Sequence, residues 1–249
     1  MWRFIFKMKV KTHHIVALLF IFMLMANSVF GQQSPSSPEV TEKQLSMKPP
    51  RDFRPTKLKL SVDAVPLFIT AFSKVRDGYG FQATVDFDQY YLAFEMGGQR
   101  TERGESYQYN NEGNYWSVGP EINLLKNARN GNALTFGLRY GQAKFNDRLT
   151  FSEPGTFFGT IDTDATNPDL TARWMELTTS LSVHVTKGLY MGYTVRYKVL
   201  RSVKGIGVMA PYDVPGFGLY EDNTGVQFNY YIGWAIPLRN QYPTQLPEN

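Results

Sequence analysis

From residue 57 onward, the chain alternates apolar and polar residues with a period of two, the pattern of a β-strand with one apolar face. In Ala133–Gly141, for example, Leu134 and Phe136 alternate with Thr135 and Gly137. Eight segments alternate in this way, and no segment has a convincing helical period. The predicted strands are Lys57–Leu67, Gly78–Phe87, Tyr90–Gly97, Asn114–Leu125, Ala133–Gly141, Trp174–Thr186, Gly188–Leu200 and Gly225–Leu238. In the fourth of these, Pro120 lacks an N–H for the ladder and predicts a β-bulge.

The connections between these segments alternate between long and short. The short ones are Asp88–Gln89, Lys126–Asn132 and the turn around Lys187, and the long ones are Phe68–Asp77, Gly98–Gly113, Gln142–Arg173 and Arg201–Thr224. An even number of strands with this alternation is typical of outer-membrane barrels. The sequence therefore predicts an all-β fold, an eight-stranded antiparallel up-and-down transmembrane β-barrel over residues 57–238. The long loops are expected outside the cell and both termini in the periplasm.

Alternation alone does not say which face of the barrel points outward. A periplasmic lipocalin-like carrier of a small ligand would turn its apolar face inward. Here the polar face is rich in small residues and carries both signs of charge, which suits a narrow lumen in which the charges pair. Aromatic residues stand near the strand ends on the apolar face, as in the girdles of membrane barrels. These residues are Tyr79, Trp116, Tyr140 and Tyr197 at one end and Phe87, Tyr90 and Trp234 at the other. Lipid outside is the favoured interpretation.

The N-terminal region reads as a targeting segment followed by a linker. Residues 1–31 combine four basic residues, an apolar run of eleven (Ile15–Met25) and a small-residue exit, the pattern of a cleaved signal peptide. Residues 32–56 contain five prolines and no apolar periodicity, which predicts a flexible periplasmic leader. Residues 239–249 form a C-terminal tail.

Charge and composition exclude several classes of protein. The formal net charge is +4, but the first 31 residues hold four basic residues and no acidic one, so the remainder is formally neutral. A neutral body does not attract phosphate backbones over distance, so nucleic acid is not the expected partner. The chain has no cysteine, which removes disulfide scaffolds, cysteine–zinc sites and thiol nucleophiles.

Two patterns superficially suggest chemistry. His184 shares a strand face with Ser180, Ser182 and Glu176, the residue types of a hydrolytic triad, yet its strand places it near the periplasmic end of the lumen. A histidine satisfied within the lumen is the preferred interpretation, and an outer-membrane lipid-modifying enzyme remains an alternative.

The stretch Asp162–Asp169 has carboxylates at the spacing of a calcium loop. It has Asn167 where the turn glycine belongs and Arg173 where the closing acidic ligand belongs. A solvated polar loop is the better interpretation.

The connection Arg201–Thr224 is unusually apolar for an exterior loop. Exposed apolar surface usually marks a partner or folds back onto the protein itself. Tyr212, Pro215 and Phe217 are accordingly candidate partner-binding residues, and packing over the barrel mouth is the alternative.

Several blocks of the chain resemble an uncharacterised family of small outer-membrane β-barrel proteins from Bacteroidota, known as a domain of unknown function. The blocks are LKLSVDAVPL (Leu58–Leu67), LTFGLRYG (Leu134–Gly141), LYMGYTVRYK (Leu189–Lys198), PYDVPGFG (Pro211–Gly218) and NYYIGWAIPL (Asn229–Leu238). The resemblance implies a barrel and an outer-membrane location, and it supplies no activity and no site residues.

The resulting expectation is an outer-membrane protein with a structural or partner-binding role. Its partners would be outer-membrane lipid and an envelope protein that meets its extracellular loops or its periplasmic leader. We expect no catalysis, no cofactor and no metal site.

Overall fold

A computed structural model describes residues 53–73, 75–87, 89–104, 107–125, 131–155 and 159–239. The predicted signal peptide at 1–31, nearly all of the predicted leader at 32–56 and the tail after residue 239 lie outside the described residues. No helix in the described ranges is long and apolar enough to cross a bilayer.

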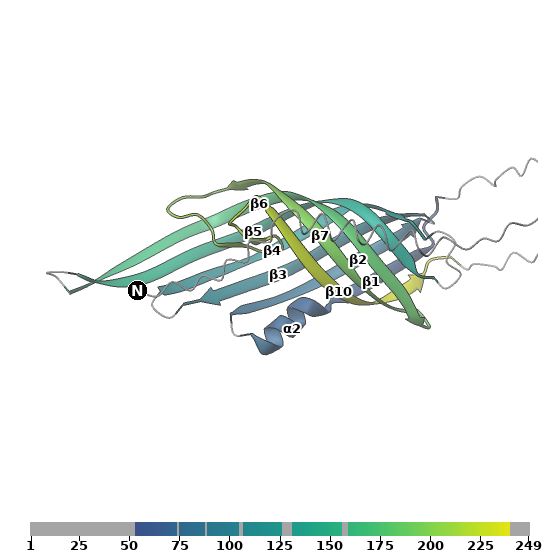
Figure 1. The fold of residues 1–249 in the computed structure, drawn as a ribbon, viewed down its shortest axis with the longest axis horizontal. Coiled ribbons are helices and arrows are strands. Elements are labelled where there is room, and N and C mark those ends of the chain that lie inside the picture. Colours follow the sequence, from purple (N-terminus) through teal and green to yellow (C-terminus); the bar gives the residue numbers. More distant parts are fainter. Residues whose placement is uncertain are drawn as a thin grey trace, which may run out of the picture. The chain divides into compact units, whose positions relative to one another are not determined.

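The strands form a closed antiparallel barrel in which each strand pairs with its neighbours in the chain and the last main strand pairs with the first (Figure 1). The barrel strands are β1 (Lys57–Asp63), β2 (Arg76–Phe87), β3 (Tyr90–Arg103), β4 (Tyr107–Asn123), β5 (Ala133–Gly155), β6 (Gly159–Thr186), β7 (Leu189–Lys204) and β10 (Thr224–Pro237). A short hairpin, β8 (Asp213–Val214) and β9 (Gly218–Leu219), stands apart from this ring, and a helix, α2 (Ala64–Phe72), follows β1. The predicted eight-stranded up-and-down barrel is confirmed.

We call the end at which β2 joins β3 and β6 joins β7 the turn end, and the opposite end the loop end. At the turn end, the backbone N–H of Thr56 donates to the carbonyl of Asp86 (2.8 Å), and that of Leu238 donates to the carbonyl of Thr56 (3.0 Å). The described parts of the chain that lead into and out of the barrel therefore meet at the turn end.

Two predicted loops are largely strand. Much of Gly98–Gly113 belongs to β3 and β4, and most of Gln142–Arg173 belongs to β5 and β6, which have 23 and 28 residues. A tilted strand needs only about 9–11 residues to cross a bilayer. The prediction stopped where the outward residues cease to be apolar. Beyond that point, both faces of an extended strand are polar, and the alternation that marks a lipid-facing strand is lost.

The prediction of a strand through Leu67 was wrong, because β1 ends at Asp63 and α2 begins at Ala64. The Asp63 carboxylate caps this helix by accepting a hydrogen bond from the backbone N–H of Val65 at 3.1 Å. The helix packs mainly against β2 and, to a lesser extent, β10, the two strands that flank β1. The helix α2 thus lies where the loop-end half of a strand would otherwise continue the barrel wall.

The predicted bulge at Pro120 was also wrong. The register of β4 with β5 is the same on both sides of Pro120, from Val118 opposite Tyr140 to Glu121 opposite Gly137. The missing N–H interrupts the pairing without adding a residue, and no shift is needed. The bulges lie elsewhere, at Phe145–Asp147, Arg173–Trp174 and His184–Thr186.

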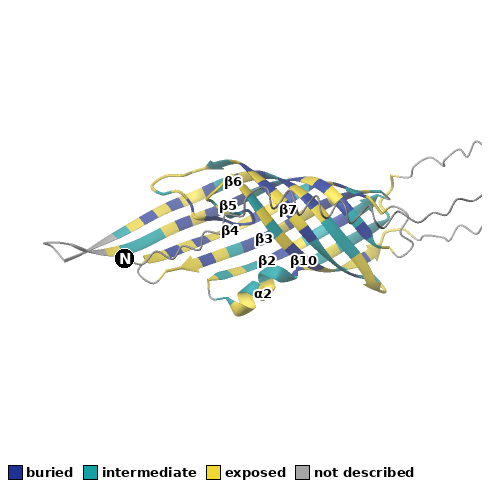
Figure 2. Cartoon of the chain, in the orientation of Figure 1, coloured by how far each residue is buried: buried dark blue, intermediate teal, exposed yellow. Residues whose placement is uncertain are grey.

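The outward face of every barrel strand is apolar in a continuous band, while inward residues are buried (Figure 2). One exposed outward side chain from each strand in turn is Leu60, Phe81, Phe94, Trp116, Leu138, Leu177, Tyr197 and Phe228. The charged residues Glu95, Arg139 and Arg196 point inward and are at most 1% exposed. This orientation is that of a membrane-spanning barrel and the reverse of a lipocalin-like carrier.

The band has aromatic side chains at both limits. Trp116 and Tyr140 contact one another at its loop-end limit, with ring centroids 5.7 Å apart. Between these two residues and the loop end, the outward residues become polar; Gln108 on β4 and Arg148 on β5 are examples, and both are exposed. The band therefore covers only the turn-end half of β5 and β6, and the remainder of these strands extends beyond it (Figure 1).

From the apolar band we predict that the free-energy cost of introducing a charged side chain depends on where along the strand it is placed. Leu138→Arg, in the middle of the band, is expected to destabilise the barrel in lipid vesicles by about 2–4 kcal/mol. Gln108→Arg, outward-facing above the band, is the matched control and is expected to change stability little. Urea titrations of reversible folding into vesicles measure both. Equal effects of the two substitutions would contradict the placement of the band.

Candidate functional site

The lumen at mid-height holds six charged side chains, three acidic and three basic, and none is more than 5% exposed. The members of this charge cluster are Glu95 on β3, Glu121 on β4, Glu176 on β6, Arg139 on β5, and Arg196 and Lys198 on β7. Their charges sum to zero when all are ionised. All six lie on the polar faces identified in the sequence, so the prediction that both signs pair inside the barrel is confirmed.

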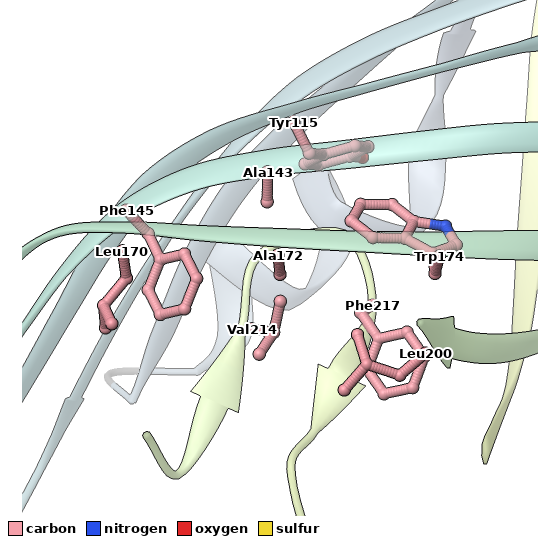
Figure 3. Packing of buried hydrophobic residues seen from close by; sticks show 9 residues of the cluster. All are labelled: Tyr115, Ala143, Phe145, Leu170, Ala172, Trp174, Leu200, Val214 and Phe217. Carbon is pink, nitrogen blue, oxygen red and sulfur yellow. The ribbon is translucent and has the colours of Figure 1, made fainter. Parts of the chain in front are cut away.

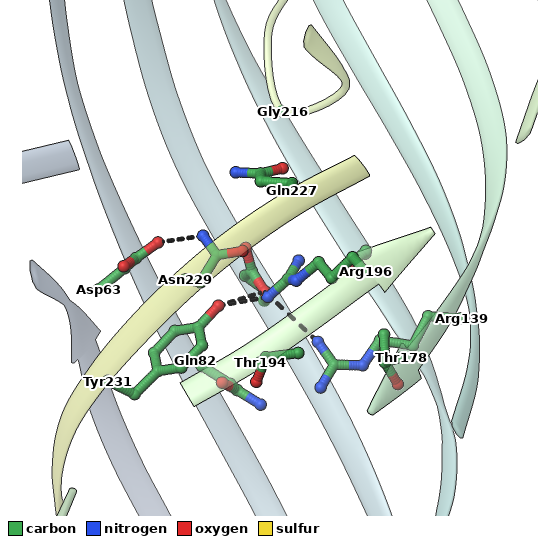
Figure 4. A network of polar contacts seen from close by, with 12 residues as sticks. Asp63, Gln82, Arg139, Thr178, Thr194, Arg196, Gly216, Gln227, Asn229 and Tyr231 are labelled. Carbon is green, nitrogen blue, oxygen red and sulfur yellow. Dashed lines mark hydrogen bonds and ion pairs between the residues drawn. The ribbon is translucent and has the colours of Figure 1, made fainter. Parts of the chain in front are cut away.

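The two guanidinium groups link the acidic residues to one another. Arg139 donates to Glu121 through Nε at 3.0 Å and through a terminal nitrogen, and it pairs with Glu95 at 3.4 Å. Arg196 pairs with the same Glu95 oxygen and with Glu176 at 3.4 Å. Both guanidinium groups donate to Oε2 of Glu95, and Figure 4 shows Arg139 and Arg196 close to one another in this network. The Tyr231 hydroxyl also donates to Glu95, at 3.0 Å.

Glu176 connects this cluster to the loop end. Its carboxylate accepts hydrogen bonds from Trp174 Nε1 and from the Ser117 hydroxyl, both at 3.1 Å. Lys198 lies 3.9 Å from Glu176 and donates to the carbonyl of Gly216, in the turn of the β8–β9 hairpin. The charge cluster thus links the inward faces of β3, β4, β5, β6 and β7, and Lys198 ties it to the β8–β9 hairpin.

Below the charge cluster, toward the turn end, lies a small cavity of about 50 Å³ that Lys59, Tyr91, Ser182 and Tyr190 help to line. The Lys59 ammonium donates to the Ser182 hydroxyl at 3.2 Å. It also lies over the rings of Tyr190 and Tyr91, 5.0 and 5.6 Å from their centroids. These contacts satisfy a buried cation largely through a hydroxyl and two aromatic faces.

The connection between β7 and β10 folds into the loop end of the barrel, and we call its residues 205–223 the plug. Among the candidate partner-binding residues, Pro215 and Phe217 are buried inside the barrel, and Tyr212 is 37% exposed at the mouth. The fold-back alternative from the sequence therefore describes residues 213–217, which are buried, and of the three candidates Tyr212 alone presents its side chain at the surface.

Val214 and Phe217 of the plug complete an apolar cluster inside the upper barrel (Figure 3). Figure 3 shows Phe217 beside Trp174, and their ring centroids are 6.1 Å apart. The wall contributes the remaining members, Tyr115, Ala143, Phe145, Leu170, Ala172, Trp174 and Leu200. Val214, Pro215 and Phe217 of the loop are thus buried, while its apolar residues Ile206, Val208 and Leu219 remain exposed.

Polar contacts fix the same segment. One Asp213 oxygen accepts hydrogen bonds from Arg76 at 2.5 Å, Gln99 at 2.8 Å and Thr101 at 2.9 Å. The Asn167 side chain accepts from the backbone N–H groups of residues 207 and 208 and donates to the carbonyl of residue 209, at 2.7–3.1 Å. The plug is therefore held by β2, β3 and β6 at once.

The structure does not assemble a triad around His184. This side chain is exposed at the turn end, where its Nε2 accepts from the N–H of Gly188 at 3.5 Å and its ring lies against Tyr190. The hydroxyls of Ser180 and Ser182 accept hydrogen bonds from Thr194 and Lys59, respectively.

The stretch 162–169 is part of strand β6 rather than a loop. The exposed Asp164 carboxylate pairs with Arg148 through two contacts of 3.0 and 2.6 Å, while Asn167 points inward to the plug. An extended strand sends successive side chains to opposite faces, so this segment does not gather its oxygens around one ion.

Sequence reasoning found the charge cluster but missed the polar residues at the contact between wall and plug: Asn111 and Asn167 on the wall and Asp213 in the plug. All three lie in segments that the sequence assigns to loops. In the predicted loop Gly98–Gly113, Tyr109, Asn111 and Gly113 continue the two-residue period of a strand. Because the residues between them are also polar, apolar and polar positions do not alternate there, and the strand was not recognised.

The charge cluster predicts an asymmetry between buried and exposed ion pairs. Arg196→Met leaves Glu95 and Glu176 without their main counter-charge and is expected to cost about 3–5 kcal/mol of folding free energy. Arg148→Met removes the exposed pair with Asp164 and is expected to change stability little. Folding titrations in vesicles compare the two, and a similar small loss for both would contradict the role of the cluster.

The docking of the plug predicts a requirement for glycine at residue 216. Gly216 has φ of +72°, and a Cβ there would lie 2.3 Å from Cγ of Tyr115. Gly216→Ala is expected to release the plug and speed tryptic cleavage after Arg201 and Lys204. Gly225→Ala is the control, because its Cβ would make only ordinary contacts, the nearest at 3.5 Å from the carbonyl of Phe217. Unchanged cleavage of Gly216→Ala would show that the plug docks in another way.

Comparisons with known proteins give a family and a distant structural likeness. The crystal structure of Neisserial surface protein A (NspA) is similar to this chain with a TM-score of 0.36 and 10% sequence identity. The match covers 73% of this chain and 95% of that one. Among curated proteins, no sequence matches the chain.

The resemblance seen in the sequence blocks is confirmed at the family level. A family profile described as "Domain of unknown function (DUF6048)" matches residues 12–241, a range that contains every strand of the barrel and the plug. Because this match spans well over half of the sequence, the chain belongs to the DUF6048 family.

Proposed function

We propose that this protein is an outer-membrane β-barrel with a non-catalytic, structural or partner-binding role at the cell surface. The loop end would face the cell exterior, and the turn end would face the periplasm. The apolar outward band supports insertion into a membrane. The extensions of β5 and β6 beyond this band at the loop end, together with the long connection between β7 and β10 there, support this orientation.

The observation that argues against a channel is that side chains and plug residues occupy the lumen. The six-membered charge cluster occupies the cross-section at mid-height, and the plug with its apolar contacts occupies the lumen above it. Eight strands leave an interior only wide enough for side chains. Both facts favour a role on the surface of the barrel over transport through it.

The loop end offers a defined polar and aromatic surface for a partner. The Arg103 guanidinium lies 5.1 Å from the centroid of the Tyr212 ring and donates to its hydroxyl, and Tyr109 packs edge-on against the same ring at 5.7 Å. Together with Tyr107 and Met209, these side chains line a shallow pocket beside the plug. Aromatic residues and arginine held in place in this way are the side chains that most often anchor protein interfaces.

Single-cysteine variants test this proposal, since the chain has no cysteine of its own. Tyr212→Cys at the loop end is expected to react with a membrane-impermeant, thiol-reactive photo-crosslinker on intact cells. After illumination it should yield a discrete crosslink to an envelope protein. Lys187→Cys at the turn end and the buried Phe217→Cys are matched controls that should not react.

Each outcome bears on a separate part of the proposal. Labelling of Lys187→Cys in place of Tyr212→Cys would overturn the orientation. Labelling of Tyr212→Cys without any crosslink to a second protein would overturn partner binding through this surface and leave the structural role.

A further inference from the structure

Helix α2 has no polar face. Its nine residues, Ala64–Phe72, include no charged residue, and Thr70 is its only polar side chain. None of these nine residues is buried. A helix that is apolar all round is normally enclosed by a protein core or by hydrocarbon. The residues that the structure describes therefore leave an apolar surface of α2 uncovered.

The uncovered surface is formed by Leu67, Phe68 and Phe72, which we call the α2 face. Phe68 and Phe72 are 64% and 77% exposed, and Phe228, the most exposed phenylalanine of the described barrel strands, is 52% exposed. The rings of Phe68 and Phe72 lie against one another, with centroids 4.5 Å apart. Figure 2 shows α2 on the outside of the barrel wall. The α2 face thus projects from the wall further than the outward side chains of the strands do.

The polar side chain of α2 serves a strand edge that β1 leaves open. β1 pairs with β2 only as far as Phe81, and the rest of β2 toward the loop end lies beside the helix. The Thr70 hydroxyl accepts from the backbone N–H of Gly78 at 2.8 Å and donates to the carbonyl of the same residue at 3.3 Å. Backbone groups at hydrocarbon depth must be satisfied within the protein. Thr70 satisfies Gly78 where β1 no longer reaches.

The two ends of α2 also have few bare backbone groups. In the first turn, the N–H of Val65 donates to the Asp63 carboxylate at 3.1 Å, and Pro66 has no N–H to satisfy. At the other end, the N–H of Ser73 donates to the carbonyl of Ile69 at 2.7 Å. A helix closed in this way can lie in an apolar environment at little cost.

The partner of Thr70 gives the depth of α2 relative to the apolar band. Gly78 is next to Tyr79, an exposed aromatic residue whose ring lies 5.9 Å from that of Phe81 in the band. The α2 face therefore continues the band at its loop-end limit. With nine residues, α2 is about 14 Å long. A hydrocarbon core is about 30 Å thick, so the helix fits within one leaflet.

We propose that the α2 face is a lipid contact, with Leu67, Phe68 and Phe72 lying among acyl chains near the loop-end limit of the band. The inference rests on the proposed insertion of the barrel, and in the proposed orientation these chains belong to the outer leaflet. Continuity with the apolar band selects lipid as the occupant. The helix then has its Thr70 side bonded to β2 and its α2 face in hydrocarbon.

A second copy of the chain fits this surface less well. Apolar surfaces gain little by pairing inside a bilayer, because lipid tails are equally apolar, and helix contacts there rely on small residues that allow close approach. The α2 face presents one leucine and two phenylalanines instead. A stable protein interface also buries about 800 Å² on each partner and involves about 20–30 residues, far more than this helix offers.

Quenching by brominated lipid tests the contact on the full chain, which has no cysteine of its own. Phe68→Cys is labelled with a bimane fluorophore and folded into phosphatidylcholine vesicles whose acyl chains either carry bromine or do not. Bromine quenches only at close range, so this label should lose as large a share of its emission as a label at Leu138→Cys in the middle of the band. Gln108→Cys, outward-facing beyond the band, is the matched control and should lose little.

The two outward sites separate this inference from the proposed function. Quenching at Leu138→Cys without quenching at Phe68→Cys would overturn the lipid contact and leave insertion of the barrel standing. Quenching at neither site would overturn insertion itself. If Phe68→Cys were quenched only after the protein is diluted in the vesicles, a second copy would be the occupant in place of lipid. Phe72→Cys, at the other ring of the α2 face, provides the same test if Phe68→Cys does not fold.

Discussion

The rest of the structure depends on the pairing of six buried charges within a ring of eight strands. A narrow barrel in lipid has no room for bulk water to solvate ions, and these six charges find their counter-charges on other strands. Glu95 receives both Arg139 and Arg196, and Glu176 receives Arg196 with Lys198 nearby. These contacts cross the lumen between β3, β5, β6 and β7, so they fix the strands relative to one another. They also place Lys198 where it can hold the plug.

On the loop-end side of this cluster, buried residues of the plug occupy the lumen. Phe217 packs against Trp174, whose indole N–H is engaged by Glu176, so the apolar and the charged layers share one side chain. The same fold-back brings Asp213 against Thr101 on the opposite wall. The connection between β7 and β10 thus runs from the interior of the barrel to the surface that carries Tyr212.

The sequence was most informative where lipid and lumen impose opposite chemistry on alternate residues. Leu138 and Arg139 are neighbours in the chain, and the structure places one in the outward band and the other at zero exposure. Above the band this contrast vanishes, and the strand extensions through Asp147 and Asn167 were predicted as loops. The helix after Asp63 was missed because its apolar run began in phase with the preceding strand. The register between distant strands determines which wall residues contact the plug. Local sequence patterns do not predict that register.

The helix in the wall has a mechanical consequence. Because β1 stops at Asp63, the backbone ladder that joins β2 to β10 through β1 ends there, and α2 bridges the remainder with side chains. Asp63 marks the junction: its carboxylate accepts from the N–H groups of Val65 and Tyr230 and from the Asn229 amide, tying the helix to β10. A cylinder with one seam of fewer hydrogen bonds opens there first under load. This seam is where unzipping of the barrel should begin and where insertion into the membrane should finish.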